Sequence, residues 1–149
     1  MTEPMRFTFP LPPNLANGRM HWRTLTRKKT AYNADCDVLQ LHELPPPPAQ
    51  PFARATIAVT LTVGAQMDHD NAVARCKWPI DWLVTRGYLV DDKPKHLSWT
   101  GFPLQRVRRS EHGVDITLTP LLSPAPPVWR TREMSEPHTL TARAEQGGT

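Results

Sequence analysis

Apolar and polar residues alternate most regularly between residues 53 and 63. A period of two residues is typical of a β-strand that buries one face. The apolar positions of this segment are Ala55, Ile57, Val59, Leu61 and Val63. Threonines occupy most of the remaining positions, and Gly64 follows the last apolar residue. The pattern therefore predicts a strand over residues 53–63 that ends at Gly64.

A helical spacing of apolar residues extends from Trp22 to Glu43. The prolines at 45–48 would end this helix and form a stiff linker. The side chains predicted to be buried are Leu25, Tyr32, Cys36, Val38 and Leu39.

A second helix is predicted from Asn71 to Arg86, with Asp70 near its N-cap. Gly87 follows directly, where a helix commonly ends in a left-handed residue. Pro79 falls inside this segment, where proline can kink a helix. The predicted apolar stripe consists of Val73, Cys76, Ile80, Leu83 and Val84.

Three further segments show strand patterns. Residues 6–9 form a short alternating run, and residues 96–108 and 114–118 read as two strands joined by a loop at 110–113. The order is strand, helix, strand, helix, strand, strand. It predicts an α/β (α+β) fold, with a small mixed sheet and two main helices in one domain.

The composition changes after residue 121. Prolines and glycines interrupt a polar stretch without apolar periodicity, so residues 122–149 are expected to form a Pro-rich, mostly disordered tail. The 149 residues include 18 Lys and Arg against 14 Asp and Glu, a net charge of +4. All of this excess lies in residues 1–121. A basic domain of this kind fits a nucleic-acid partner.

Other features narrow the class of protein. The chain has no apolar run long enough to span a membrane, and its first residues lack the pattern of a signal peptide. We therefore expect a cytoplasmic protein without a membrane partner. Cys36 and Cys76 lack the spacing of a zinc site or a disulfide framework, so two reduced thiols are expected.

Four aspartates in two short clusters stand out against the basic background. Asp68 and Asp70 are separated by one residue, and Asp91 and Asp92 follow about twenty residues later. Concentrated acids in a basic protein suggest a divalent cation that faces a polyanion. Carboxylates suit Mg²⁺, with Mn²⁺ as an alternative, so the pattern is that of a metal-dependent nuclease.

The second predicted helix carries polar residues beside its apolar stripe. Asp70, Ala74, Lys77 and Asp81 fall on one line along it. Lys77 would lie about two turns from Asp70, where it could contact the scissile phosphate or orient a water. A structural interpretation stays open: Asp70 as a plain N-cap, Lys77 and Asp81 as a surface ion pair, and the later acids as a turn.

Two motifs resemble the RusA family of Holliday junction resolvases. The first consists of Asp68-His69-Asp70-Asn71, then Lys77, Asp81, Gly87 and Asp91-Asp92. The second, which is similar to an early N-x-R-x-H-W-R element of that family, is Asn17-Gly18-Arg19-Met20-His21-Trp22-Arg23. The motifs occur in the expected order, and with a β-hairpin that ends near Leu121 the resemblance covers about 115 residues.

The resemblance implies a RusA-like domain over residues 1–121. It implies a Mg²⁺-dependent, homodimeric endodeoxyribonuclease of phage or prophage type, which resolves four-way DNA junctions by paired nicks in recombination and repair. It also implies that Asp68, Asp70 and Asp92 are metal-site carboxylates, that Lys77 is catalytic, and that Asp91 is an extra candidate ligand. The role of Asp81 stays open. The alternatives are a non-catalytic branched-DNA-binding protein and a flap or fork nuclease.

Basic residues form two patches that are expected either to contact DNA phosphates or to be a solvated face. The denser patch consists of Arg19, His21, Arg23, Arg27, Lys28 and Lys29. The second consists of Lys93, Lys95, Arg106, Arg108 and Arg109. His69 is expected to point away from the acids on either side. Core or dimer-interface positions are expected for Trp22, Trp78, Trp82 and Trp99, and an exposed position for Trp129.

Overall fold

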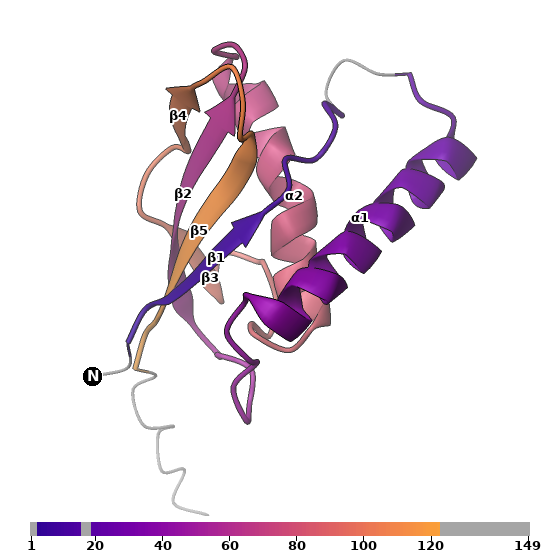
Figure 1. Cartoon of the computed structure of the whole chain (residues 1–149). Coiled ribbons are helices and arrows are strands. Elements are labelled where there is room, and N and C mark those ends of the chain that lie inside the picture. The colour runs from indigo at the N-terminus through magenta and orange to yellow at the C-terminus, as the bar shows by residue number, and fades with distance from the viewer. Residues whose placement is uncertain (1–2, 16–18, 123–149) are drawn as a thin grey trace, which may run out of the picture.

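The computed structural model describes residues 3–15 and 19–122, which form one sheet and two helices (Figure 1). The elements are β1 (Met5–Phe9), α1 (Trp22–His42), β2 (Ala55–Val63), α2 (His69–Thr85), β3 (Leu97–Trp99), β4 (Leu104–Val107) and β5 (Gly113–Pro120). The predicted α+β class with a mixed sheet is confirmed. The predicted tail, apart from Leu122, and Trp129 lie outside the described residues.

Strand β2 is the centre of the sheet. It pairs antiparallel with β5 along one edge, and β5 pairs antiparallel with β1. Along its other edge β2 pairs parallel with β3 near its start and with β4 near its end. Both helices lie on the same side of this sheet (Figure 1). The sheet therefore has one covered face, on which the core is built.

The alternation predicted for β2 is confirmed by the burial of its side chains. Ala55, Ile57 and Leu61 are fully buried, and Val59 and Val63 are nearly so. Aromatic rings join the sheet to α2: the Trp82 ring lies 5.4 Å from Phe9 of β1 and 5.6 Å from Tyr88, centroid to centroid. These contacts hold α2 against the sheet.

Helix α2 begins two residues earlier than predicted. Asp68 is its N-cap, so Asp70 lies in the first turn instead of beside the cap. The predicted end at Gly87 is confirmed, because Gly87 has a positive φ of 84°. There the Tyr88 N–H donates to the Leu83 carbonyl at 3.0 Å. This left-handed ending turns the chain towards the Asp91–Asp92 segment.

Burial on the helices departs from the predicted stripes at two valines. Tyr32 and Cys36 of α1 are buried as predicted, but Val38 is 57% exposed. The reason is angular: Val38 lies two residues from Cys36, about 200° around the helix. On α2, Val73 is 41% exposed and faces a surface hollow instead of the core.

The single strand predicted over residues 96–108 is wrong. The segment forms two short strands, β3 and β4, and residues 100–103 between them belong to no strand. Pro103 has no N–H to donate to a ladder, which favours the break. The predicted hairpin is also wrong, because β4 and β5 pair with opposite edges of β2. Strand β5 lies between β1 and β2, and its alternate residues Val114 and Ile116 are buried there.

The tryptophans divide into two groups. Trp78 and Trp82 are buried in the core, as predicted, whereas Trp22 is exposed and Trp99 is 39% exposed. Trp99 is exposed because β3 is an edge strand that pairs only with β2 among the described strands. None of the helices in the described ranges is long and apolar enough to span a membrane.

Candidate functional site

Asp68 and Asp70 share a polar hollow at the start of α2. Both side chains are exposed, and with residues 66, 67 and 69 they line a hollow of about 420 Å³. The Asp68 side chain makes no capping hydrogen bond, although this residue is the N-cap. Both carboxylates thus lie where the unpaired N–H groups of the first helical turn point.

Gln105 of β4 fixes the backbone that leads into this hollow. Its side-chain oxygen accepts from the Met67 N–H at 2.9 Å, and its amide nitrogen donates to the Met67 carbonyl at 2.8 Å. The pair of bonds ties the residue before Asp68 to the edge of the sheet. No sequence pattern predicted this role, because an isolated glutamine in a strand has many structural uses.

Lys77 lies on the same side of α2, about two turns beyond Asp70. Its side chain is 64% exposed, and its ammonium lies 3.3 Å from Asp81 Oδ1. The second oxygen of Asp81 accepts from Lys29 of α1 at 2.7 Å. The surface ion pair that the structural interpretation foresaw is therefore present. Asp81, whose role was left open, is the carboxylate that forms ion pairs with both lysines.

Asp92 approaches the same helix from the segment before β3. It lines a hollow of about 180 Å³ together with Lys77, Val73 and Trp99, so Asp92 and Lys77 are brought to one place. Asp91 is held locally: its carboxylate lies 3.2 Å from the Lys93 ammonium and accepts from the Asp92 N–H at 2.8 Å. The hydrogen bond from Lys93, aided by the Asp92 N–H, lowers the pKa of Asp91.

The candidate residues thus lie in two hollows along one side of α2. Asp68 and Asp70 line the first, and Lys77 and Asp92 line the second, which lies further along the helix. Within residues 3–15 and 19–122, no group of three or more His, Cys, Asp or Glu side chains is gathered closely enough to hold a metal ion. The convergence of Asp68, Asp70 and Asp92 on one ion stays a prediction.

The donor set nevertheless suits a hard cation. In the described part of the chain, the carboxylates of Asp68 and Asp70 have neither a hydrogen-bond nor an ion-pair partner, whereas the Asp92 side chain interacts with that of Asp91. By contrast, Asp37 and Asp81 are each bound by two other side chains. Free carboxylate oxygens are the ligands that Mg²⁺ takes while it keeps several waters. Asp68 and Asp70 are therefore the residues that would hold it.

The basic patch around α1 is partly engaged in local contacts. His21 is the N-cap of α1, and its Nδ1 accepts from the Arg23 N–H at 3.3 Å. The Arg23 guanidinium lies 5.3 Å from the Trp22 ring centroid, within the range of a cation–π contact. Lys29 is paired with Asp81, whereas Arg19, Arg27 and Lys28 are exposed.

Phe102, which lies beside the acids and stacks on His69, was missed by the sequence analysis. His69 is the first residue of α2, and its ring stacks on Phe102 at a centroid distance of 4.6 Å. Phe102 lies in the stretch between β3 and β4, which had been predicted as continuous strand. To predict an exposed aromatic ring next to the two carboxylates, one would have to know that this stretch is not part of the sheet.

No protein-family model matches the chain, and no curated protein matches it.

Proposed function

We propose that this protein is a Mg²⁺-dependent endonuclease that nicks branched DNA, as the RusA-like motifs imply. The observation that carries the proposal is the shared hollow of Asp68 and Asp70, whose carboxylates are unpartnered in the described chain. Unpaired acids in a basic protein repel DNA phosphates unless a cation lies between them. An acid at a helix N-terminus stabilises the helix, but the open hollow and the free oxygens of both carboxylates also suit phosphate chemistry.

Each residue has a role that follows from its position. Asp68 and Asp70 would hold the ion, which when bound lowers the pKa of a coordinated water and neutralises charge on the phosphate. Lys77, exposed and two turns along, would contact the scissile phosphate. Asp92 shares the hollow of Lys77, where it would orient that ammonium or complete the ligand set. Asp91, already held by Lys93, is the weaker candidate ligand.

The proposed substrate is a four-way junction, and the proposed active form is a homodimer. A junction has approximate two-fold symmetry, and its resolution needs nicks in two opposed strands. A C₂ dimer with one site per subunit meets that requirement. Such a role requires access to DNA, so a cytoplasmic location in a bacterial cell is part of the proposal.

The test uses the full chain with synthetic four-way junction, flap, fork and linear duplex substrates. Cleavage is expected with Mg²⁺ or Mn²⁺ and not with EDTA, and it should be greatest on the junction. If flaps or forks are cleaved more than the junction, the proposed substrate is wrong but the proposed reaction, DNA cleavage, still holds. The Asp70→Asn variant should bind the junction and lose at least about 100-fold in cleavage rate.

A matched control is Asp35→Asn, which removes one exposed carboxylate from α1. It should cleave at the wild-type rate. Wild-type cleavage by Asp70→Asn in Mg²⁺ would refute the assignment of this site.

A DNA-binding protein without nuclease activity is the second candidate. It is favoured by the absence of a three-residue metal cluster in the described ranges and by the pairing of Lys77 with Asp81. Tight junction binding, with no nick in either metal ion at saturating protein, would favour this candidate.

A further inference from the structure

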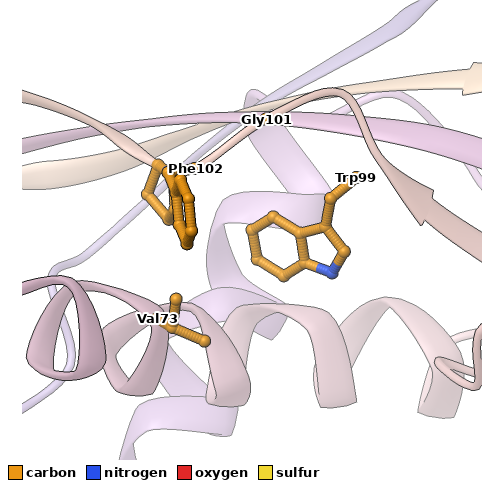
Figure 2. A pocket seen from close by; sticks show the side chains of 5 residues that line it. Val73, Trp99, Gly101 and Phe102 are labelled. Atoms are coloured by element: carbon orange, nitrogen blue, oxygen red, sulfur yellow. The ribbon is translucent and has the colours of Figure 1, made fainter.

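An apolar hollow, which we call the aromatic hollow, lies between α2 and the stretch that follows β3. Its volume is about 410 Å³, and its lining residues are Val73, Trp99, Gly101, Phe102 and Pro103. Figure 2 shows the rings of Trp99 and Phe102 projecting towards α2, with Val73 of that helix below them. Phe102 is 69% exposed, and Trp99 is 39% exposed. Two large rings are thus kept partly in water instead of in the core.

This aromatic hollow lies between the two parts of the candidate site. At one end, Phe102 stacks on His69, the residue between Asp68 and Asp70. At the other end, Val73 and Trp99 also line the small hollow that contains Lys77 and Asp92. A strand that passes from the acids to Lys77 along α2 would cross the aromatic hollow.

We propose that the aromatic hollow receives one unstacked nucleobase of the bound DNA, held against Trp99 or Phe102. The proposal rests on the proposed function and names how that site would engage its substrate. Bases stack on aromatic side chains with little sequence preference, and nucleotides at a branch point unstack more easily than those in a duplex. A base held there would place its flanking phosphates towards the acids on one side and Lys77 on the other.

The charges around the hollow favour a nucleotide over a second protein surface. Asp70 and Lys77 lie on the same side of α2 as Val73, and Asp92 and Lys77 line the adjoining hollow. A protein partner that covered the rings would also cover these groups, and burying charges without good partners is costly. A base inserts alone, and its backbone stays in water beside them.

The experiment measures binding to junctions in which one nucleotide lacks its base. The full chain is titrated with Ca²⁺ in place of Mg²⁺, so that a divalent cation lies between the acids and the DNA, against a fluorescent junction and a set with a single abasic site at each branch-point nucleotide. Denaturing gels would show that the DNA stays intact. Wild type should bind one member of the set about 5- to 100-fold more weakly than the intact junction. Trp99→Ala together with Phe102→Ala should bind the intact junction and that abasic junction equally.

The control variant is Leu104→Ala, which removes an exposed apolar side chain from the neighbouring strand. It should keep the wild-type preference, and Trp99→Phe should keep most of it. Circular dichroism would show that each variant is folded. If the double variant fails to fold, the wild-type abasic set and Trp99→Phe still decide the outcome.

Three results would overturn the proposal: equal wild-type binding to every junction in the set, no junction binding at all, or a full preference in the double variant. A dimer that becomes a monomer in the double variant would show that the hollow is an interface between chains. The proposed nuclease fails separately, if the wild type shows the abasic preference but does not cleave the junction in Mg²⁺ or Mn²⁺. Cleavage without the preference refutes only the base-binding hollow.

Discussion

The side chain of Gln105 forms two hydrogen bonds with the backbone of Met67, at 2.9 Å to its N–H and 2.8 Å to its carbonyl. Met67 precedes the N-cap of α2, so the free edge of the sheet sets where that helix starts. The position of Asp68 and Asp70 therefore depends on a residue 35 or more positions away in the sequence. This contact makes Gln105 a positioning residue for the proposed metal site.

Gln105→Ala is expected to lower the apparent affinity for Mg²⁺ substantially, with a smaller effect on the free energy of unfolding. Loss of the two bonds would free the chain before Asp68, and outer residues that orient ligands commonly affect metal affinity by about 10- to 100-fold. The Mg²⁺ concentration for half-maximal cleavage should rise by that order while junction binding in EDTA stays unchanged. Gln50→Ala, at an exposed position in the linker, is the control. An unchanged Mg²⁺ dependence in Gln105→Ala would remove the positioning role.

Lys77→Ala is expected to lower the cleavage rate at saturating DNA by about 100-fold. Its effect on stability should be small, because the exposed ion pair with Asp81 is worth roughly 0–1 kcal/mol. Lys77→Arg keeps the charge but changes the shape of the cation, so only partial activity is expected. Single-turnover kinetics and urea unfolding measure the two effects. Arg54→Ala, which removes one exposed charge outside both basic patches, should cleave like the wild type; a similar loss there would indicate a general charge effect.

Periodic patterns predicted the elements whose burial is regular. The alternation in β2, the helical spacing in α1 and α2, and the glycine after α2 each reflect a local rule, and all were confirmed. The prediction of one strand over residues 96–108 was wrong because Trp99 and Phe102 resemble the apolar residues of a buried strand but are partly or largely exposed. No local rule distinguishes an exposed aromatic residue from a core residue.

The candidate site was predictable as a set of residue types but not as a geometry. The motif pointed to Asp68, Asp70, Lys77 and Asp92, and the fold brings them to one side of α2 in two hollows. The contacts that pair Lys29 with Asp81, or Gln105 with Met67, join segments 38 or more residues apart. Such contacts depend on the packing of α1, α2 and the sheet, which a single sequence does not specify.

Two adjacent lysines on α1 are expected to differ in their effect on DNA binding. Lys28 is exposed and has no partner among the described side chains, whereas Lys29 is already paired with Asp81. If Lys28 contacts a phosphate, Lys28→Ala should reduce the slope of log K against log salt by about 1. Lys29→Ala should reduce it less. Fluorescence anisotropy over a salt series measures both slopes; equal slopes would mean that the Asp81 pair does not divert Lys29 from DNA.

The two cysteines are expected to be unreactive in the folded protein. Burial raises the pKa of the Cys76 thiol to about 12, and burial raises that of Cys36 to about 12 against an opposing hydrogen bond with Tyr32. At pH 8, roughly one thiol in ten thousand would be a thiolate. A thiol reagent should therefore react slowly with the folded protein in buffer. In concentrated urea it should react quickly, with two thiols per chain. Val107→Cys, which places a thiol at an exposed position of β4, should add one fast reaction.

Asp37 gives the fold a defined dependence on pH. Its carboxylate accepts from the Trp82 indole and from Arg86, which links α1 to α2. Partial burial raises the pKa of Asp37, but the hydrogen bonds and charge of its partners outweigh this effect and lower the pKa overall. The stabilisation is therefore complete above the unfolded pKa of about 3.9 and is lost as the pH falls through the lower folded value.

Asp37→Asn should lower the free energy of unfolding at pH 7 by about 1 kcal/mol, a modest value because the pair is more than a third exposed. The difference from the wild type should shrink as the pH falls below the unfolded pKa of about 3.9 towards the lower folded value, because the unfolded wild type then takes up a proton that the folded protein does not. Urea unfolding at a series of pH values measures it. Asp35→Asn, on the exposed side of the same helix, should show neither the loss nor the pH dependence. A difference for Asp37→Asn that persists undiminished at pH 2 would mean that the ion pair is not its source.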